Sequence, residues 1–292
     1  MNGNNYTIGI TDASKISNDR LRANNFTPFV SDDFAKRVDP EKVFPDAKSI
    51  VVACVSYGVD KFYSNLSSLG IFEDYHVRVK DVLRTEADKL EELHGPFKFK
   101  ILVDGPALCE RSLAVRAGLG FFGRHGLVIS PEFGSRFNIG VMLTDIPLYE
   151  INSSFRGPQR RSNPFNDHCP DECRLCIKAC PNGAINESRP LTANLCISYL
   201  TQKENLKAEE KELLHGQLYG CDICQNVCPK NVKHVTLYVD PEKILMLSDR
   251  EVNEQFGHTA MNWKLGLLKR NALIAKGRRE RKDESCLFTP TA

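Results

Sequence analysis

The chain has 292 residues, 41% of them apolar and 26% charged, which is the balance of an ordinary globular protein with one large domain or two modest ones. A formal net charge of +2 does not indicate nucleic-acid binding through overall charge, so any basic surface has to be local. No run reaches the roughly 18 apolar residues of a membrane span, and residues 1–12 lack the apolar core of a signal peptide. We expect a cytoplasmic protein, monomeric and without a membrane partner.

Residues 1–150 combine buried-strand patterns with helical patterns, as in a mixed α/β domain. Apolar and β-branched runs predict strands over 49–55, 97–103, 126–130 and 139–143. Helical periodicity predicts helices over 75–93 and 106–117.

The second half divides by composition. Proline, arginine, serine and asparagine crowd residues 151–168, which predicts a linker. A cysteine-rich segment occupies 169–235. Residues 236–292 read as a helical C-terminal segment, with a helix over 263–275 and a charged tail over 276–282.

Eight of the eleven cysteines lie between residues 169 and 228, and in a cytosolic protein this density indicates metal ligation or redox chemistry. The first half of the pattern reads C-x3-C-x2-C-x3-C-P from Cys169 to Pro181. The second reads C-x2-C-x3-C-P from Cys221 to Pro229, and Cys196 stands between the halves. The three remaining cysteines are expected to be core residues (Cys54, Cys109) or to lie in a frayed tail (Cys286).

This doubled pattern is typical of ferredoxins with two [4Fe–4S] clusters, in which the cysteine before proline ligates the other cluster. Cluster one is predicted to take Cys169, Cys173, Cys176 and Cys228. Cluster two is predicted to take Cys180, Cys196, Cys221 and Cys224. Eight cysteines thus fill eight ligand positions, and we expect the protein to move single electrons. The alternative is a pair of Zn(Cys)4 sites, which also use C-x2-C spacing but do not need the repeated C-P ending.

One spacing departs from the usual form, because three residues rather than two separate Cys169 from Cys173, with Pro170 where a cysteine is expected. We expect the extra residue to bulge outward so that Cys169 still ligates. His168 is expected to be a solvated linker residue, and the alternative is that it substitutes as a ligand. A bare ferredoxin needs about 60 residues, whereas about 150 precede this module. That excess predicts a catalytic domain, and the fold class expected is α+β: an N-terminal α/β domain, a dicluster ferredoxin-like domain and a short helical C-terminus.

The chain resembles the epoxyqueuosine reductase family over roughly residues 35–277. The resemblance is carried by VDGPALCERSLAVRAGLGFFGRH (103–125), GLVISPEFGS (126–135), LTDIPL (143–148), CPNGAI (180–185), CISYLT (196–201) and YGCDICQ (219–225). Further matches are Arg37-x-Asp39-Pro40, FPDAKSI (44–50), DYH (74–76) and LKRNALIAKG (268–277).

The resemblance implies a base-off cobalamin over the α/β domain, a low-potential electron donor such as a flavodoxin or ferredoxin, and a tRNA substrate. The implied reaction removes the epoxide oxygen of epoxyqueuosine to give queuosine. Asp104 matches the family's proton donor, and it follows a predicted buried strand. The alternative from the residues alone is that Asp104 caps the next helix, with Pro106 in its first turn.

The resemblance also implies a set of cofactor contacts, each of which could otherwise be a plain polar residue: Arg37, Asp104, Arg111, Arg124, His125 and Ser135 from the α/β domain, with Ser198 and Asp222 from the cluster side. The glycines of Gly118-x-Gly120-x-x-Gly123 are read as a loop that gives a flat cofactor clearance. An ordinary helix cap and turn is the alternative reading of this loop.

For tRNA, the candidates are Arg156, Arg160 and Arg161 of the linker and the basic residues of 276–282, which could instead simply be solvated. The family continues into stacked helical repeats where this chain ends, about 15 residues after the 268–277 match. We therefore expect a shortened member of the family that binds tRNA more weakly. The rival functions are a related cobalamin and iron–sulfur reductase of another substrate, of the reductive dehalogenase kind, and a dicluster electron carrier without cobalamin.

Overall fold

The computed structural model describes residues 5–16, 33–57, 62–105, 107–154, 168–187, 191–232 and 236–287. Its N-terminal half is built on a four-stranded sheet in the order β1-β2-β7-β4, formed by β1 (Tyr6–Asp12), β2 (Ser49–Ser56), β7 (Phe137–Thr144) and β4 (Phe99–Val103). Every neighbouring pair runs antiparallel, with Val52 opposite Gly9 on one side and Val141 on the other.

Strand β2 lies in the middle of this sheet because nearly all of its residues are apolar, and it is buried from Ser49 to Val55. Its side chains alternate between two cores. Ile50, Val52 and Cys54 face one core, whereas Val51 and Ala53 face the other. The sheet is thus covered on both faces.

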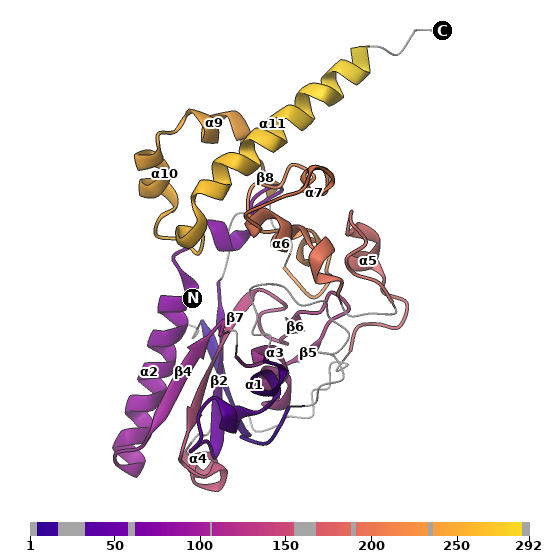
Figure 1. Cartoon of the computed structure of the whole chain (residues 1–292). Helices are drawn as coiled ribbons and strands as arrows, with labels where there is room; N and C mark the ends of the chain where they lie inside the picture. Colours follow the sequence, from indigo (N-terminus) through magenta and orange to yellow (C-terminus); the bar gives the residue numbers. More distant parts are fainter. Residues whose placement is uncertain are drawn as a thin grey trace.

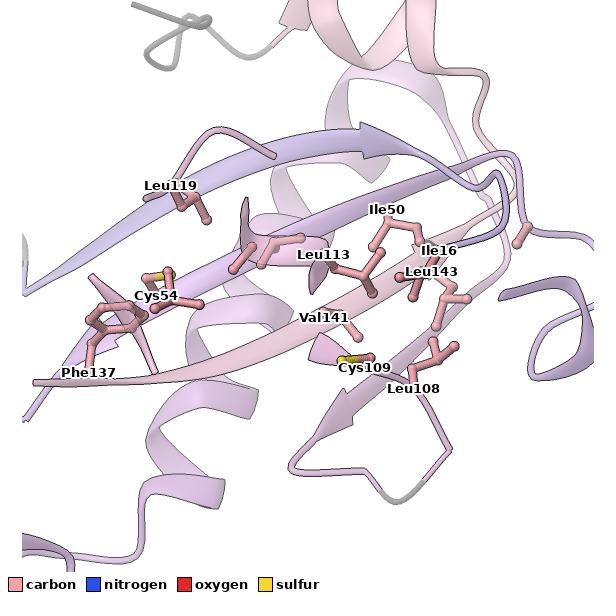
Figure 2. Close-up of a cluster of buried hydrophobic side chains, with 14 residues drawn as sticks. Ile16, Ile50, Cys54, Leu108, Cys109, Leu113, Leu119, Phe137, Val141 and Leu143 are labelled. Atoms are coloured by element: carbon pink, nitrogen blue, oxygen red, sulfur yellow. The ribbon is translucent and has the colours of Figure 1, made fainter. Parts of the chain in front are cut away.

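Helix α2 (Tyr75–His94) packs on one face of the sheet, and α1 (Phe34–Val38) and α3 (Glu110–Arg116) pack on the other (Figure 1). Leu113 of α3 points into the core that contains Ile50, Val52 and Cys54, which Figure 2 shows between the strands and the α3 segment. Cys54 and Cys109 lie in the same cluster (Figure 2). The prediction that these two cysteines are core residues is confirmed.

The second half consists mainly of short helices. The remaining strands of the whole described chain form two small two-stranded sheets. The short elements are β3 (Phe62–Tyr63), β5 (Phe121–Phe122), β6 (Val128–Ile129), β8 (Thr236–Leu237), α4 (Leu148–Ser154), α5 (Leu175–Ala179), α6 (Ile197–Gln202), α7 (Ala208–Glu212), α8 (Ile223–Asn226), α9 (Pro241–Met246) and α10 (Asp249–Phe256). The long helix α11 (Gly266–Leu287) closes the described chain and extends away from the rest of the molecule (Figure 1). A third core joins α9, α10 and α11 to the segment that precedes Cys221.

The structure confirms the strands over 49–55, 97–103 and 139–143 and the helix over 75–93 to within a few residues. It adds one strand, β1, and corrects four other predictions. β1 was not predicted, because its sequence is half polar and its pairing partner lies about 40 residues away. The strand expected over 126–130 shrinks to the two residues of β6.

The other corrections concern helices. The helix expected over 106–117 begins only at Glu110. Residues 151–154 of the predicted linker belong to α4, and residues 155–167 lie outside the described part of the chain. The predicted charged tail continues α11, because apart from Gly277 its residues from Lys276 to Lys282 are all good helix formers.

Candidate functional site

A cavity of about 340 Å³ opens beside the C-terminal end of β4. Its walls are apolar at Leu69, Leu108, Leu127, Val128, Phe137 and Ile139 and polar at Arg37, Tyr75, Asp104, Glu110, Arg111 and Ser135. A concave site with a mostly apolar lining and a few converging polar groups is the usual form of a ligand or cofactor site. Four of the predicted site residues therefore meet in one place: Arg37, Asp104, Arg111 and Ser135.

Asp104 follows β4 with a backbone φ of +50°, a left-handed conformation that non-glycine residues rarely adopt. Its carboxylate accepts a hydrogen bond of 2.7 Å from the Tyr75 hydroxyl. Helix α3 starts at Glu110 after Cys109, which makes no side-chain cap. The alternative that Asp104 caps this helix is wrong, and its carboxylate is left on the cavity wall.

Glu110 holds the backbone of the Asp104 turn. Its two carboxyl oxygens accept hydrogen bonds from the Asp104 amide at 3.1 Å and the Gly105 amide at 3.0 Å. Burial raises the pKa of Glu110 to about 8, and the negative charge of Asp104 acts in the same direction. Burial and the nearby Asp104 also raise the pKa of Tyr75. The turn is thus fixed from two sides, by a buried carboxyl and by a phenol.

Sequence reasoning assigned no role to Tyr75 or Glu110. Tyr75 lies within the DYH match and Glu110 within the match that follows Asp104, so both were visible as family residues. Only the folded chain brings the Tyr75 hydroxyl, 29 positions away in sequence, onto Asp104.

The other predicted contacts lie outside the cavity lining. Arg124 donates to the carbonyl of Asp171 at 3.0 Å, near the first cysteines. His125 is buried, its Nδ1 accepts from the Leu127 amide, and burial lowers its pKa to about 4. Ser198 lies in α6, where its carbonyl accepts from the side chains of that helix.

Asp222 is also outside the lining, in a buried network between the two halves of the chain. Its carboxylate accepts from Ser67 Oγ at 2.8 Å, from Ser68 N at 2.8 Å and from Ser68 Oγ at 2.6 Å. Gln225 completes the set from the same loop at 3.3 Å. The structure therefore gives Asp222 a role in joining the cluster segment to the segment that follows β3.

The glycine triplet has close neighbours within the chain itself. Gly118 follows the end of α3 with a φ of +77°, as the alternative reading expected. A Cβ at Gly120 would lie 2.3 Å from the Ile129 carbonyl oxygen, and one at Gly123 would lie 2.7 Å from the Ile129 side chain. These glycines allow β5 and β6 to approach each other, and clearance for a cofactor stays a prediction.

The first predicted set of four cysteines is brought together. Burial raises the pKa of Cys176 to about 11, and the charges of Cys169, Cys228 and Cys173 add to this effect. Burial also raises the pKa of Cys228, and the charges of Cys169 and Cys173 add to this effect. Cys169 also packs beside Cys228 in a small apolar cluster with Phe121 and Ile129.

The second predicted set is brought together as well. Burial raises the pKa of Cys221 to about 12, and the charges of Cys196 and Cys180 act in the same direction. Burial raises the pKa of Cys224 well above its usual value, and the charges of Cys221 and Cys196 act in the same direction. The charge of Cys176, from the first set, adds to this effect. Crowded thiols whose negative charge is disfavoured fit a centre that supplies positive iron to them. Across the described residues, no three His, Cys, Asp or Glu side chains are arranged to hold a single metal ion.

The fold and the site define a class: a mixed α/β domain with a polar cavity, joined to a domain that binds two iron–sulfur clusters, in an oxidoreductase. Residues 168–231 match the family described as a 4Fe-4S double cluster binding domain, and residues 37–105 match the family described as Epoxyqueuosine reductase QueG, DUF1730. The chain belongs to the epoxyqueuosine reductase family.

Three relatives illustrate the similarity. Epoxyqueuosine reductase from Bacillus subtilis (strain 168) is 34% identical over 275 residues, which cover 85% of this chain and 67% of the relative. A solved structure of the Bacillus subtilis enzyme, described with its catalytic aspartate loop swung out of the active site, has a TM-score of 0.76 and 30% identity, covering 92% of this chain and 76% of that one. A solved complex of an epoxyqueuosine reductase with an epoxyqueuosine-modified tRNA stem loop has a TM-score of 0.75 and 29% identity, with the same coverage.

Within the described ranges, no helix combines the length and the apolar character needed to cross a bilayer.

Proposed function

We propose that this protein removes the epoxide oxygen of epoxyqueuosine in tRNA and so forms queuosine. Two electrons and two protons are consumed, and the oxygen leaves as water. The observation that carries the proposal is Asp104, held on the wall of a cavity beside the cluster domain in a chain of this family. The relative solved with a modified tRNA stem loop supports the choice of substrate.

The cavity suits cobalamin as the second cofactor. Its lining combines apolar side chains, which suit the face of a flat macrocycle, with Arg37, Arg111 and Ser135, whose polar groups suit the amide side chains of the cofactor. Bound cobalamin would supply a metal centre able to react with the strained C–O bond of the epoxide. Arg124, His125, Ser198 and Asp222 lie farther out and would contact only the periphery of the cofactor.

The residues of the chain supply the proton and the orientation. In its acid form, Asp104 gives a proton to the alkoxide oxygen released when the epoxide opens. Tyr75 fixes the rotamer of Asp104 through the 2.7 Å hydrogen bond, and Glu110 fixes the backbone of its turn. The relative whose catalytic aspartate loop swings out supports a turn that is held in place by specific contacts.

Two bound clusters would supply single electrons to the reaction. Cys169, Cys173, Cys176 and Cys228 would hold cluster one, and Cys180, Cys196, Cys221 and Cys224 would hold cluster two. The proximity of Cys176 to Cys224 supports a short electron path between the clusters. A low-potential carrier such as a flavodoxin or ferredoxin would supply these electrons. The protein would work in the cytoplasm and as a monomer.

The basic residues proposed for tRNA are partly engaged within the chain. Lys276 pairs with Glu242 at 3.5 Å, and Arg278 donates to the Glu212 carbonyl at 2.6 Å. Arg156, Arg160 and Arg161 lie outside the described residues. We retain the boundaries 1–150, 151–168, 169–235 and 236–292 as functional units, with α4 extending into the second.

The test is an anaerobic turnover assay with the whole chain, reconstituted with iron, sulfide and cobalamin, on tRNA that carries epoxyqueuosine. Nucleoside mass spectrometry should show queuosine, and Asp104→Asn should lower the rate by about 10²–10⁴-fold, the usual contribution of a positioned acid. Asp88→Asn on the surface of α2 is the matched control. A protein with eight irons, bound corrin and no queuosine would contradict the proposed substrate, and wild-type turnover by Asp104→Asn would contradict the proton donor.

A further inference from the structure

Arg136 carries a buried positive charge at the junction of the two halves of the chain. The residue is 7% exposed and lies between Ser135 and the start of β7. Its guanidinium stacks over the Phe62 ring, with 3.6 Å from the carbon centre to the ring centroid. Nη2 donates to Asn226 Oδ1 at 2.8 Å, while Nε and Nη1 are buried without a hydrogen-bond partner.

Among the described residues, no carboxylate oxygen is hydrogen-bonded to this guanidinium, because Nε and Nη1 have no partner and Nη2 donates to Asn226. The nearest candidate, Asp222, already accepts four hydrogen bonds from Ser67, Ser68 and Gln225. Burying a charge without a paired counter-charge is costly, and a cation–π contact offsets only part of that cost. Some other negative group is therefore expected beside Arg136.

The neighbours of Arg136 identify that group. Asn226 ends α8, the short helix that contains Cys224 of cluster two and is followed by Cys228 of cluster one. Through its hydrogen bond to Asn226, Arg136 is linked to the segment that carries one proposed ligand of each cluster. Burial lowers the pKa of Arg136, and interactions with Tyr57, Asp222, Cys228 and Cys224 act in the opposite direction. A guanidinium keeps its proton in proteins, so the charge is permanent.

We propose that Arg136 is the counter-charge of the two clusters and raises their reduction potentials. A [4Fe–4S] cluster with four thiolates is an anion, and uptake of one electron from the reduced carrier makes it more negative by one charge while the carrier is oxidised by one electron. A fixed positive charge in a poorly solvated site favours the more negative form. Arg136 would thus keep the clusters reducible by the donor.

This inference rests on the proposed ligand assignment, and the experiment separates the two. Reconstituted wild type, Arg136→Lys, Arg136→Gln and Arg136→Met are compared by iron content and by an anaerobic potentiometric titration with dithionite, followed by electron paramagnetic resonance. Methionine is included because it can pack on Phe62 without buried polar atoms. Arg84→Gln, a change of the same charge on the exposed face of α2, is the control.

We expect full iron in all variants. In the two neutral variants the ratio of reduced to oxidised cluster at a fixed potential should fall at least tenfold for one or both clusters, a shift of ~59 mV for a one-electron couple. Arg136→Lys and Arg84→Gln should stay near wild type. Full iron with unchanged potentials in both neutral variants would overturn the inference. Loss of iron in both neutral variants but not in Arg136→Lys would also overturn it, in favour of a purely structural role. Low iron in the wild type itself would count against the ligand assignment instead.

Discussion

At the scale of single residues, the orientation of Asp104 depends on contacts from two directions. A left-handed backbone at a non-glycine residue costs of order 1–3 kcal/mol and persists only where the surroundings enforce it. The Tyr75 hydroxyl holds the side chain, and the Glu110 carboxyl holds the Asp104 and Gly105 amides. The proton donor is therefore placed by residues that need not touch the substrate.

Tyr75→Phe should lower kcat about tenfold, because it removes one hydrogen bond to a charged group while leaving the ring in place. Binding of cobalamin, followed by its absorbance, should change little. Tyr149→Phe on exposed α4 is the control. Equal kcat in Tyr75→Phe and wild type would show that this hydrogen bond does not position Asp104.

Glu110→Gln should change the pH dependence of stability. The pKa of Glu110 in the folded protein is about 8 against 4.5 for an ordinary glutamate, so the folded state keeps a proton that the unfolded chain has released. The stability due to this group is therefore full below about pH 4.5 and declines as the pH rises toward about 8. Glutamine does not titrate, so the Tm of the variant minus that of wild type should increase by several degrees from about pH 5 to about pH 8. Two Tm curves that run parallel over this range would contradict the shifted pKa.

At the scale of elements, a buried amide helps to attach α11 to the cluster domain. Asn271 is fully buried, and its Nδ2 donates to the Thr201 carbonyl at 2.9 Å and the Leu218 carbonyl at 2.7 Å. Thr201 lies near the end of α6, the helix that follows Cys196, and Leu218 lies three residues before Cys221. The helix therefore braces two of the segments that carry the proposed ligands of cluster two.

Asn271→Ala should lower the Tm by about 4–10 °C, because the buried Leu218 carbonyl loses its donor at a cost of about 1–3 kcal/mol and the Thr201 carbonyl keeps only the hydrogen bond from Arg270. Leu273→Ala, two residues along the same helix and 63% exposed, should leave the Tm within about 2 °C of wild type. Thermal unfolding followed by circular dichroism measures both. Similar losses in the two variants would mean that helix propensity, and not the buried amide, sets the effect.

At the scale of the whole molecule, a polar network joins the α/β half to the cluster half. The Tyr57 hydroxyl and Ser135 Oγ both donate to Gln225 Oε1, at 3.2 Å and 3.0 Å, and the Ser135 amide donates to Asn231 Oδ1 at 2.7 Å. Gln225 and Asn231 lie on either side of Cys228. Buried networks of this kind fix one relative arrangement of two parts, because a shift would leave several polar groups unpaired.

The exchange of ligands between the cysteine halves gives a direct prediction about iron. Cys228→Ala should remove cluster one and Cys196→Ala cluster two, so each variant should retain about four irons in place of about eight. Iron analysis and the visible absorbance of the reconstituted protein measure this. Cys54→Ala, in the apolar core, is the control and should retain all its iron. Unchanged iron in both ligand variants would contradict the assignment.

The sequence by itself determined the features that depend on near neighbours along the chain. The alternation of β2, the periodicity of α2 and the spacing of the cysteines are all local, and the structure places the cysteines in the two predicted sets. The family motifs identified Asp104 in the same way. The local pattern was misleading for α3, which starts later than predicted. The reason is that the Asp104 turn forms a hydrogen bond with the Glu110 side chain and does not continue as a helix.

The tertiary structure alone decided which distant groups meet. Tyr75 reaches Asp104 across 29 positions, and Arg136 reaches Asn226 across 90. Neither contact has a signal in composition or periodicity, because both arise from the packing of α2 and β7 against parts that are remote in sequence. Burial then changes the chemistry of these groups, raising the pKa of Glu110 and isolating the charge of Arg136, since the cost of desolvation depends on what surrounds a group in space and not on its neighbours in the chain.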